Sequence, residues 1–376
     1  MASLRRPATA LAVLTVLGAC TTPARRTNPS IRESDATAAI ESRITLTAGA
    51  TVRVVAYRLD GTGPRIELRS DSLVHAASTM KVPVMIALAL GADRATLRLD
   101  DVMPLTNRFE SIVDHSPYSL SRDDDSDSTV YERIGERVPI RWLATRMITH
   151  SSNLATNTLL TLVRADSVTE VARALGARRM RVLRGVEDGP AFRAGLNNVT
   201  TAHDLAALLV AIGTDRAASP ASCAWMRDVL FAQAYNSAIP VGLPTGTRIA
   251  HKTGDITRVE HDAALVYPEG GAPYVIVVLT SGVESQAQVE MLRGLMGGTL
   301  LRFALVDCTH VMTQRGIRRD WSPRSLRRHW MTLPIRRPWT KPVTTAASPF
   351  VRCLDWGWRG VKQQVTSRMS GNGAGH

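Results

Sequence analysis

The sequence predicts an α/β protein of the α+β type, in which an antiparallel sheet is built from both ends of the domain. Helices flank the sheet, and an all-helical subdomain is inserted between its strands. The prediction depends on β-branched runs near residues 52–68 and again within 247–280, with apolar residues at helical spacing between them. Strands at both ends of a domain and helices in its middle are typical of one sheet packed against helices.

The first twenty residues resemble a bacterial export signal. Two arginines precede the apolar run 8–16, which is too short to span a bilayer, and small residues precede Cys20. This pattern resembles a lipobox and implies cleavage before Cys20 and lipid attachment to its sulfur. An ordinary signal peptide with a chance cysteine is the alternative. We expect a signal peptide at 1–19, a flexible tether at 20–34 and a periplasmic protein anchored to the membrane.

Residues 35–307 have the composition of a globular domain, and its first part contains a predicted hairpin. A helical pattern at 36–46 leads into the strand 52–57, and after a Gly-rich turn a second short strand follows at 66–68. A long irregular region ends near residue 136. Within it, residues 122–128 include four aspartates, which we expect to form a solvated loop.

The rest of the domain supplies helices and then strands. Apolar residues recur at spacings of three and four in the helical segments, and β-branched runs follow. We expect a cleft between the sheet and the helices, because binding sites form where two such layers meet. The expected helices are 142–149, 153–164, 168–175, 202–213, 221–234 and 285–305, and the expected strands are 247–252, 263–267 and 274–280.

A serine followed three residues later by a lysine lies at the start of an apolar helix. Ser78 and Lys81 precede the apolar run 82–90, so both side chains lie on one face of the first turn. A lysine in a partly desolvated pocket can lose its proton and then accept the proton of a serine hydroxyl. The helix start also directs backbone N–H groups at a developing oxyanion. The pair predicts a nucleophilic serine.

Two further motifs follow in order along the chain. The motif Ser151–Asn153 (Ser-Ser-Asn) lies in a predicted turn about seventy residues after Ser78, and Lys252–Gly254 (Lys-Thr-Gly) ends a strand about a hundred residues later. Three ordered motifs, each in its expected structural context, are far more specific than one. Their order resembles the class A β-lactamase family and the penicillin-binding proteins, and the resemblance spans residues 35–305.

The resemblance implies catalytic roles for the matching residues. Ser78 would attack the carbonyl carbon of a β-lactam or an acyl-D-alanyl substrate and form an acyl-enzyme. Lys81 would act as its base or as the link to one, and Ser151 would relay a proton to the leaving nitrogen. The oxyanion hole would consist of the backbone N–H groups of Ser78 and Asp255.

The resemblance also implies a substrate-binding set. Asn153 would hydrogen-bond the amide side chain of the substrate, and Lys252 and Thr253 would bind its carboxylate. Gly254 would let the strand edge approach the substrate closely. Asn157 would support the catalytic lysine and the loop before it.

Hydrolysis of the acyl-enzyme requires an activated water, for which the class A family uses a glutamate on a loop. Glu187 is the candidate in this chain. The Leu-Asn pair 196–197 follows it after about ten residues rather than about four, and Asp188 stands where the family usually has proline. The alternative is a surface or salt-bridging carboxylate, paired with Arg184. Ser152 also replaces the aspartate that is most common in the family.

No residue pattern predicts a metal site or a cofactor. The histidines lack metal-ligand spacing, and none of the four cysteines has CxxC spacing. An exported location permits a disulfide between Cys223 and Cys308, but we do not expect one. We expect a monomer that binds a small-molecule substrate without a cofactor. The cysteines are Cys20, Cys223, Cys308 and Cys353.

Residues 308–376 differ in character from the domain. From Arg315 onward, thirteen Lys and Arg residues stand against two Asp, a net charge of +11 in a chain of +13, so the domain is nearly neutral. Five of the seven tryptophans also lie here, a composition that suits nucleic acid or an anionic membrane surface. A shifted reading frame is another explanation. Because five prolines interrupt the periodicity, we expect a disordered tail and no nucleic-acid partner.

The leading hypothesis is a lipid-anchored periplasmic serine β-lactamase that opens β-lactam rings through an acyl-enzyme on Ser78. A penicillin-sensitive D,D-peptidase acting on peptidoglycan stem peptides with the same serine is the alternative. A noncatalytic cell-envelope binding lipoprotein is an alternative of a different class.

Overall fold

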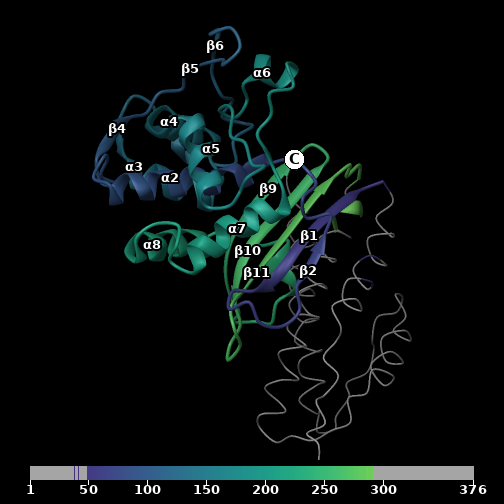
Figure 1. Cartoon of the computed structure of the whole chain (residues 1–376). Coiled ribbons are helices and arrows are strands. Elements are labelled where there is room, and N and C mark those ends of the chain that lie inside the picture. The colour runs from purple at the N-terminus through teal and green to yellow at the C-terminus, as the bar shows by residue number, and fades with distance from the viewer. Residues whose placement is uncertain (1–37, 39–40, 42–48, 286, 291–376) are drawn as a thin grey trace, which may run out of the picture. The chain divides into compact units, whose positions relative to one another are not determined.

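The computed structural model describes residues 38, 41, 49–285 and 287–290, which contain a five-stranded antiparallel sheet and a helical body (Figure 1). The strand order is β2-β1-β11-β10-β9, so the first strands of the domain pair with the last. The predicted sheet built from both termini is therefore confirmed. Its strands are β1 (Thr51–Arg58), β2 (Ile66–Leu68), β9 (Arg248–Ile256), β10 (Val259–Tyr267) and β11 (Tyr274–Ser281).

The register of the sheet explains why its last two strands contain long apolar runs. Val55 pairs with Val277, Val277 with Ala263, and Ala263 with Lys252. Val55, Ala263 and Val277 belong to the core shared with the helices, whereas Val54 packs on the opposite side of the sheet. Because successive side chains point to opposite faces and both faces are buried, β10 and β11 contain near-continuous apolar runs.

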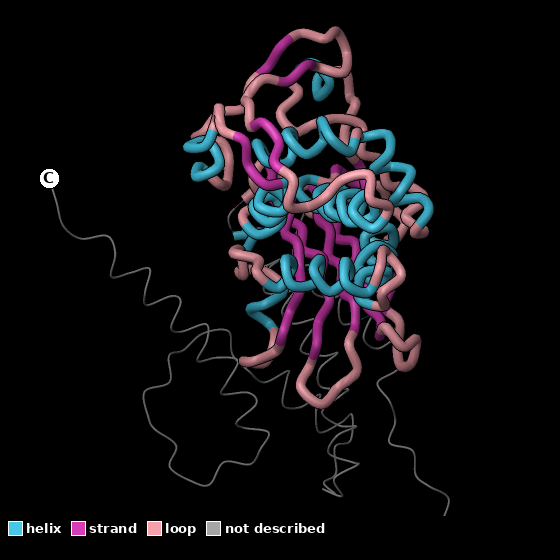
Figure 2. The backbone as a smooth tube through the Cα atoms, turned by 90° about the vertical axis from the view of Figure 1, so that its left-hand side faces the viewer, coloured by secondary structure: helices cyan, strands magenta, loops and turns pink. Residues whose placement is uncertain are grey.

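The helices between β2 and β9 lie on one side of the sheet, as Figure 2 shows. Helix α7 packs on β1, β10 and β11, α8 packs on β9, and α2 contacts α3, α4, α5 and α8. The inserted helical subdomain is therefore confirmed. The helices are α2 (Lys81–Asp93), α3 (Ile140–Thr149), α4 (Asn153–Val163), α5 (Ala165–Ala174), α7 (Ala202–Gly213) and α8 (Pro220–Phe231).

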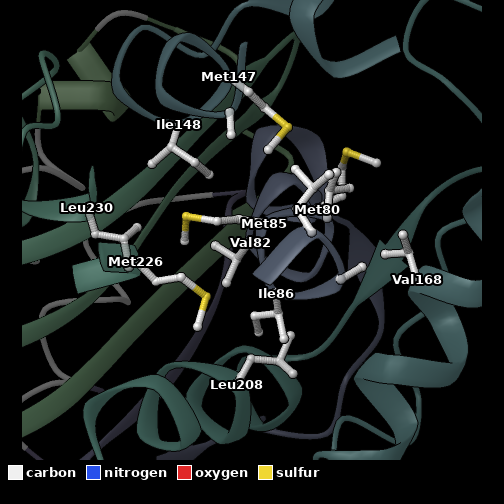
Figure 3. Close-up of a cluster of buried hydrophobic side chains, with 14 of the residues drawn as sticks. Met80, Val82, Met85, Ile86, Met147, Ile148, Val168, Leu208, Met226 and Leu230 are labelled. Carbon is white, nitrogen blue, oxygen red and sulfur yellow. The ribbon is translucent and has the colours of Figure 1, made fainter. Parts of the chain in front are cut away.

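Helix α2 is the centre of the helical body. Nine of its residues, Lys81 to Ala89, are buried, and apolar side chains surround it on every side. Figure 3 shows Val82, Met85 and Ile86 packed among methionines and leucines of neighbouring helices. A helix that is apolar all round must be buried. This packing fixes the helix that begins at Lys81.

Several short elements were not predicted from the sequence. They lie between β2 and α2, in the irregular region between α2 and α3, in the loop between α5 and α7, and between α8 and β9. Each is too short to leave a periodic signal. They are β3 (Val74–His75), η1 (Ala77–Met80), β4 (Val102–Pro104), β5 (Phe109–Glu110), β6 (Pro117–Tyr118), η2 (Ser128–Arg133), β7 (Arg137–Pro139), α6 (Gly189–Arg193), β8 (Val199–Thr200) and η3 (Ile239–Gly242).

The prediction that residues 122–128 form a solvated loop is wrong for two of the four aspartates. Asp125 and Asp127 are buried. Asp127 pairs with Arg146, whose Nε and Nη2 donate to it at 2.5 and 2.6 Å, and its carboxylate caps the start of η2 by accepting the N–H of Thr129. These carboxylates are buried because a cation and backbone N–H groups satisfy them.

Several predictions fall outside the described residues. These are the signal peptide, Cys20, the tether, most of the expected helix 36–46, the helix 285–305 beyond residue 290, and the tail 308–376. Within the described residues, no helix combines the length and the apolarity that crossing a membrane requires.

Candidate active site

The nucleophile lies in a short 3₁₀ turn at the start of α2. Ser78 belongs to η1 and is half-buried, and Lys81, the first residue of α2, is fully buried. In a 3₁₀ turn, side chains at positions i and i+3 are stacked, so both residues lie on one side of the turn. The local structure thus places the serine and lysine as the motif predicts, with a 3₁₀ turn in place of the first α-helical turn.

The ammonium group of Lys81 is fully hydrogen-bonded. Its Nζ donates to the carbonyl oxygen of Ser151 at 2.6 Å, to Ser151 Oγ at 3.2 Å and to Asn153 Oδ1 at 2.8 Å. Burial lowers the pKa of Lys81 to about 7, and the carboxylates of Asp125 and Glu187 oppose this shift. A lysine with a pKa near neutrality can act as a base at physiological pH.

Lys252 reaches the same hydroxyl group from the sheet. Its Nζ donates to Ser151 Oγ at 3.1 Å and to the carbonyl oxygen of Thr253 at 2.9 Å. Burial lowers the pKa of Lys252 well below its ordinary value, the neighbouring Lys81 lowers it further, and Asp262 opposes the shift. Ser151 therefore links the two lysines, as a proton relay between them requires.

Strand β9 approaches the nucleophile closely at Gly254. A Cβ atom there would lie 3.2 Å from Ala77 Cβ and from Thr79 Cγ2, and 3.3 Å from the backbone nitrogen of Ser78. Only a residue without a side chain fits this approach without displacing the turn. The backbone of Asp255 follows directly, and its side chain is exposed. The geometry suits an oxyanion hole between Ser78 and the edge of β9.

Glu187 lies in the site and is joined to Lys81 through one side chain. Its Oε1 accepts a hydrogen bond from Asn153 Nδ2 at 2.8 Å, while Oδ1 of the same amide accepts from Lys81. Burial raises the pKa of Glu187 above its ordinary value, and the hydrogen bond from Asn153 opposes the shift. Asn153 is therefore a bridge between the candidate base for acylation and the candidate base for deacylation.

Asn157 holds the backbone next to Glu187. The N–H of Val186 donates to Asn157 Oδ1 at 2.7 Å, and Asn157 Nδ2 donates back to the carbonyl oxygen of Val186 at 3.0 Å. Among the described residues, Asn157 makes no hydrogen bond to Lys81. Its side chain instead supports the loop at Val186 and also donates to Tyr118 Oη at 3.4 Å, so the predicted support of the lysine is not seen.

The unusual length of the loop after Glu187 is explained by helix α6. Asp188 is buried, and its carboxylate accepts the N–H of Ala191 at 3.0 Å, which caps α6. The same carboxylate accepts Ser111 Oγ at 2.8 Å and the N–H of Ile112 at 3.0 Å. The extra residues thus form a capped helix tied to the β5–β6 loop, and Glu187 keeps its place beside the lysine.

Arg184 closes the two ends of this loop and is not a partner of Glu187. Its guanidinium group donates to the carbonyl oxygen of Leu196 at 2.8 Å and to Asn197 Oδ1 at 3.1 Å. Asn198 Oδ1 accepts the N–H of Arg184 at 3.2 Å. The segment from Arg184 to Asn198 is called the Glu187 loop below.

Asp125 is a site residue that the sequence reasoning missed. Its carboxylate accepts the N–H of Leu154 at 2.9 Å and the N–H of Asn153 at 3.0 Å, and Ser152 Oγ donates to it at 3.3 Å. It therefore supplies a carboxylate at the start of α4, next to the position where the family usually has aspartate and this chain has Ser152. The sequence did contain a signal for this role. The Ser151–Asn153 motif lacks its usual aspartate, and residues 122–128 upstream contain four aspartates that could replace it.

The histidines and cysteines of the described residues form neither a metal site nor a disulfide. Within the described ranges, no three His, Cys, Asp or Glu side chains are grouped to hold a metal ion. Buried His251 contacts Asp262 Oδ1 at 2.9 Å and Asn236 Oδ1 at 3.1 Å. Cys223 is a buried free cysteine, and Cys308 lies outside the described residues.

Comparisons with known proteins agree with this geometry. The family model described as the β-lactamase enzyme family matches residues 35–303. A β-lactamase of Rhodobacter capsulatus is 26% identical over 242 residues, which cover 61% of this chain and 75% of that protein.

Solved structures give the same result. A β-lactamase from Sphaerobacter thermophilus is 26% identical with a TM-score of 0.58, covering 72% of this chain and 96% of that one. PBP-A is 23% identical with a TM-score of 0.61 and the same two coverages, and an ancestral class A β-lactamase is 22% identical with a TM-score of 0.59, covering 72% and 98%. The chain therefore belongs to the β-lactamase enzyme family and has the class A β-lactamase fold.

Proposed function

We propose that this protein is a serine β-lactamase that opens the β-lactam ring with Ser78 and hydrolyses the resulting ester with a water activated by Glu187. The observation that carries the proposal is the Asn153 amide, which bridges Lys81 and Glu187. An enzyme that only acylates needs the lysine alone. A carboxylate held beside it supplies the second base that turnover requires.

Acylation follows from the contacts of Lys81 and Ser151. The neutral amine of Lys81 accepts the proton of Ser78 Oγ, which attacks the lactam carbonyl carbon. The backbone N–H groups of Ser78 and Asp255 stabilise the oxyanion. As the ring C–N bond breaks, the proton passes from Lys81 through Ser151 Oγ, 3.2 Å away, to the leaving nitrogen.

Substrate binding depends on the middle of β9, the edge strand of the sheet. The Lys252 ammonium and the Thr253 hydroxyl suit a carboxylate, because a cation beside a hydroxyl supplies charge-assisted hydrogen bonds. Lys252 already donates to Ser151 Oγ, so a bound carboxylate would lie next to the proton relay. The substrate carboxylate and the leaving nitrogen would therefore both lie close to Ser151 Oγ.

Deacylation uses the ionised form of Glu187. The carboxylate takes a proton from water, and the hydroxide attacks the ester carbonyl carbon. Ser78 Oγ then leaves with the proton that Glu187 took from the water, which restores the carboxylate. Burial raises the pKa of Glu187, so the basic form is lost as the pH falls through a value above the ordinary 4.5. We expect an acid limb in the deacylation rate above that value.

The substitution Glu187→Gln tests the proposal. It should leave acylation by a chromogenic cephalosporin unchanged and slow deacylation by about a hundredfold or more, so that a covalent adduct accumulates on Ser78. The matched control is Glu170→Gln, which changes an exposed carboxylate on α5. Unchanged turnover in Glu187→Gln would show that another group activates the water.

The D,D-peptidase remains the second candidate, favoured by the likeness to PBP-A and by the altered spacing of the Glu187 loop. It predicts one stable penicilloyl adduct per wild-type molecule and release of D-alanine from stem peptides. A noncatalytic binding lipoprotein predicts no labelling by a fluorescent penicillin. Labelling that Ser78→Ala abolishes would exclude it.

We also propose that the enzyme is exported, lipidated on Cys20 and monomeric. The support for export and lipidation is the sequence pattern of residues 5–20. Metabolic labelling with a fatty acid tests lipidation, and the label should be absent from Cys20→Ser. Size-exclusion chromatography of a variant lacking residues 1–20 tests the monomer, and elution as a dimer would contradict it.

A further inference from the structure

The residue before the nucleophile has a backbone conformation that requires support. Ala77 has a φ of 46°, in the left-handed region that alanine disfavours, and its backbone continues directly into Ser78. Its N–H donates to His75 Nδ1 at 3.0 Å. Because a backbone N–H can only donate, His75 Nδ1 must be an acceptor and carry no proton.

A second histidine fixes the backbone of His75. His261 Nδ1 accepts the N–H of Thr280 at 3.0 Å, and His261 Nε2 lies 2.9 Å from the carbonyl oxygen of His75. One ring nitrogen faces a donor and the other faces an acceptor, so the imidazole of His261 must be neutral with its proton on Nε2. Burial lowers the pKa of His261 to about 4, in agreement with this state.

The two histidines connect the sheet to the nucleophile. His261 on β10 pairs with Gly254 on β9, the residue whose backbone contacts the Ser78 turn. His75 ends the short strand β3, which pairs with β8 next to the end of the Glu187 loop. A continuous path therefore runs from Thr280 through His261 and His75 to Ala77 and Ser78.

We propose that His75 and His261 are positioning residues for acylation, which together hold the Ala77 turn so that the hydroxyl and N–H of Ser78 face the substrate. The inference assumes the acyl-enzyme chemistry proposed above. Neither side chain contacts the reacting atoms. The two histidines can hold the Ala77 turn only while both imidazoles are neutral. A proton on His75 Nδ1 would face the N–H of Ala77, and a proton on His261 Nδ1 would face the N–H of Thr280.

The charges around the pair favour the neutral state. Burial and the guanidinium group of Arg184, on the Glu187 loop, lower the pKa of His75. Burial and the charge of Arg53 on β1 lower the pKa of His261, and hydrogen bonds with the backbone of His75 and of Glu260 oppose this shift without reversing it. At neutral pH we therefore expect uncharged rings at both positions.

Two substitutions of His75 separate its acceptor from its bulk. His75→Asn keeps an acceptor oxygen at the position of Nδ1, whereas His75→Leu removes it. We expect His75→Leu to lower the acylation rate constant for a chromogenic cephalosporin by about tenfold or more, and His75→Asn to stay within about threefold of wild type. The deacylation rate constant should fall less than the acylation rate constant in His75→Leu, because deacylation uses the N–H of Ser78 in the oxyanion hole but does not use its hydroxyl as a nucleophile. The control is His203→Leu, an exposed histidine on α7.

The outcomes that overturn the proposal are specific. Equal acylation in His75→Leu and wild type, or equal losses in the Leu and Asn variants, would refute it. A loss of deacylation without a loss of acylation would also refute it, because the proposed role includes the position of the Ser78 hydroxyl, which acts in acylation. Thermal unfolding and active-site titration with a fluorescent penicillin restrict the comparison to folded, labelled protein.

A spectroscopic measurement tests the proposed histidine tautomers independently of the proposed enzymatic activity. ¹⁵N NMR of the histidine rings at pH 7 should show neutral imidazoles with the proton on Nε2 for both His75 and His261. An imidazolium or the Nδ1–H tautomer at either residue would overturn the inference. If Ser78 is not acylated at all, the proposed function fails, while the ring tautomers remain measurable.

Discussion

Replacement of Asp125 by asparagine tests whether the acidic segment builds the site. Asp125→Asn keeps the shape of the side chain but removes one acceptor oxygen and the negative charge. In the wild type, Oδ2 accepts the N–H of Leu154 at 2.9 Å and Ser152 Oγ at 3.3 Å, and both oxygens accept the N–H of Asn153. Oδ1 also accepts the N–H of Asp127 at 3.0 Å. The single oxygen of an amide group cannot take the place of both carboxylate oxygens.

The expected loss of stability follows from these contacts. One backbone N–H loses its acceptor, either that of Asp127 or one at the start of α4, depending on the orientation of the amide, and this costs about 1–3 kcal/mol. Removing a buried negative charge from a helix N-terminus costs up to ~2 kcal/mol more. We expect the free energy of unfolding to fall by about 3 kcal/mol, which for a domain of this size lowers the Tm by roughly 6–12 °C.

Thermal unfolding of matched variants measures this effect. The control is Asp124→Asn, because its carboxylate is exposed, and its Tm should stay within about 1 °C of wild type. Adding Ser152→Asp to Asp125→Asn returns a carboxylate to the start of α4 and should recover part of the loss. A Tm for Asp125→Asn equal to that of Asp124→Asn would refute the reasoning.

The same variant has a kinetic consequence. The Asp125 carboxylate opposes the lowering of the Lys81 pKa, so its removal should lower that pKa further below about 7. The pH at which acylation reaches half of its maximum should fall with it. An unchanged midpoint would show that Asp125 affects the fold of the site without affecting the charge on the lysine.

Three further outcomes follow from the geometry. In the wild type, acylation should increase with pH through about 7, because the neutral amine of Lys81 accepts the proton, and stopped-flow rates across pH 5–9 measure this. Gly254→Ala should slow acylation by about tenfold to a hundredfold, since the new Cβ would lie 3.3 Å from the backbone nitrogen of Ser78. Gly185→Ala places a Cβ 2.6 Å from Asn157 Oδ1, so it should displace the Glu187 loop and slow deacylation, seen as a larger burst, by about tenfold or more.

The fold could be predicted because its long elements carry strong periodic signals. Helix α7 has the predicted bounds, 202–213, and β2 has the predicted bounds, 66–68. The pairing of β1 with β11 could be inferred only from the distribution of strands, since no local signal joins residues more than two hundred positions apart. The short elements could not be predicted, because two to six residues cannot establish a period.

Some residues of the candidate site could likewise be predicted from the sequence, and others could not. Among the residues predicted for acylation, Lys81 and Ser151 lie next to the starts of helices, where each motif has a recognisable local context. Lys252 lies in the middle of β9, because the strand continues to Ile256 instead of ending at the motif as expected, and the structure brings these residues together. Asp125 could not be identified, because an acidic run is usually solvated, and only the fold shows that donors at the start of α4 meet it. The His75–His261 contact joins two segments that carry no motif.

The Glu187 loop shows why spacing alone is a poor guide to deacylation. The position of Glu187 is set by the backbone of Val186, which Asn157 clamps from α4, and by the Asn153 amide. Both contacts lie on the N-terminal side of the loop and at the glutamate itself, so residues added after Glu187 do not move it. Asp188 then caps those residues into α6 and anchors them to the β5–β6 loop. The spacing between Glu187 and the following Leu-Asn pair can therefore vary among relatives without loss of the base, whereas Asn157 and Gly185 cannot change freely.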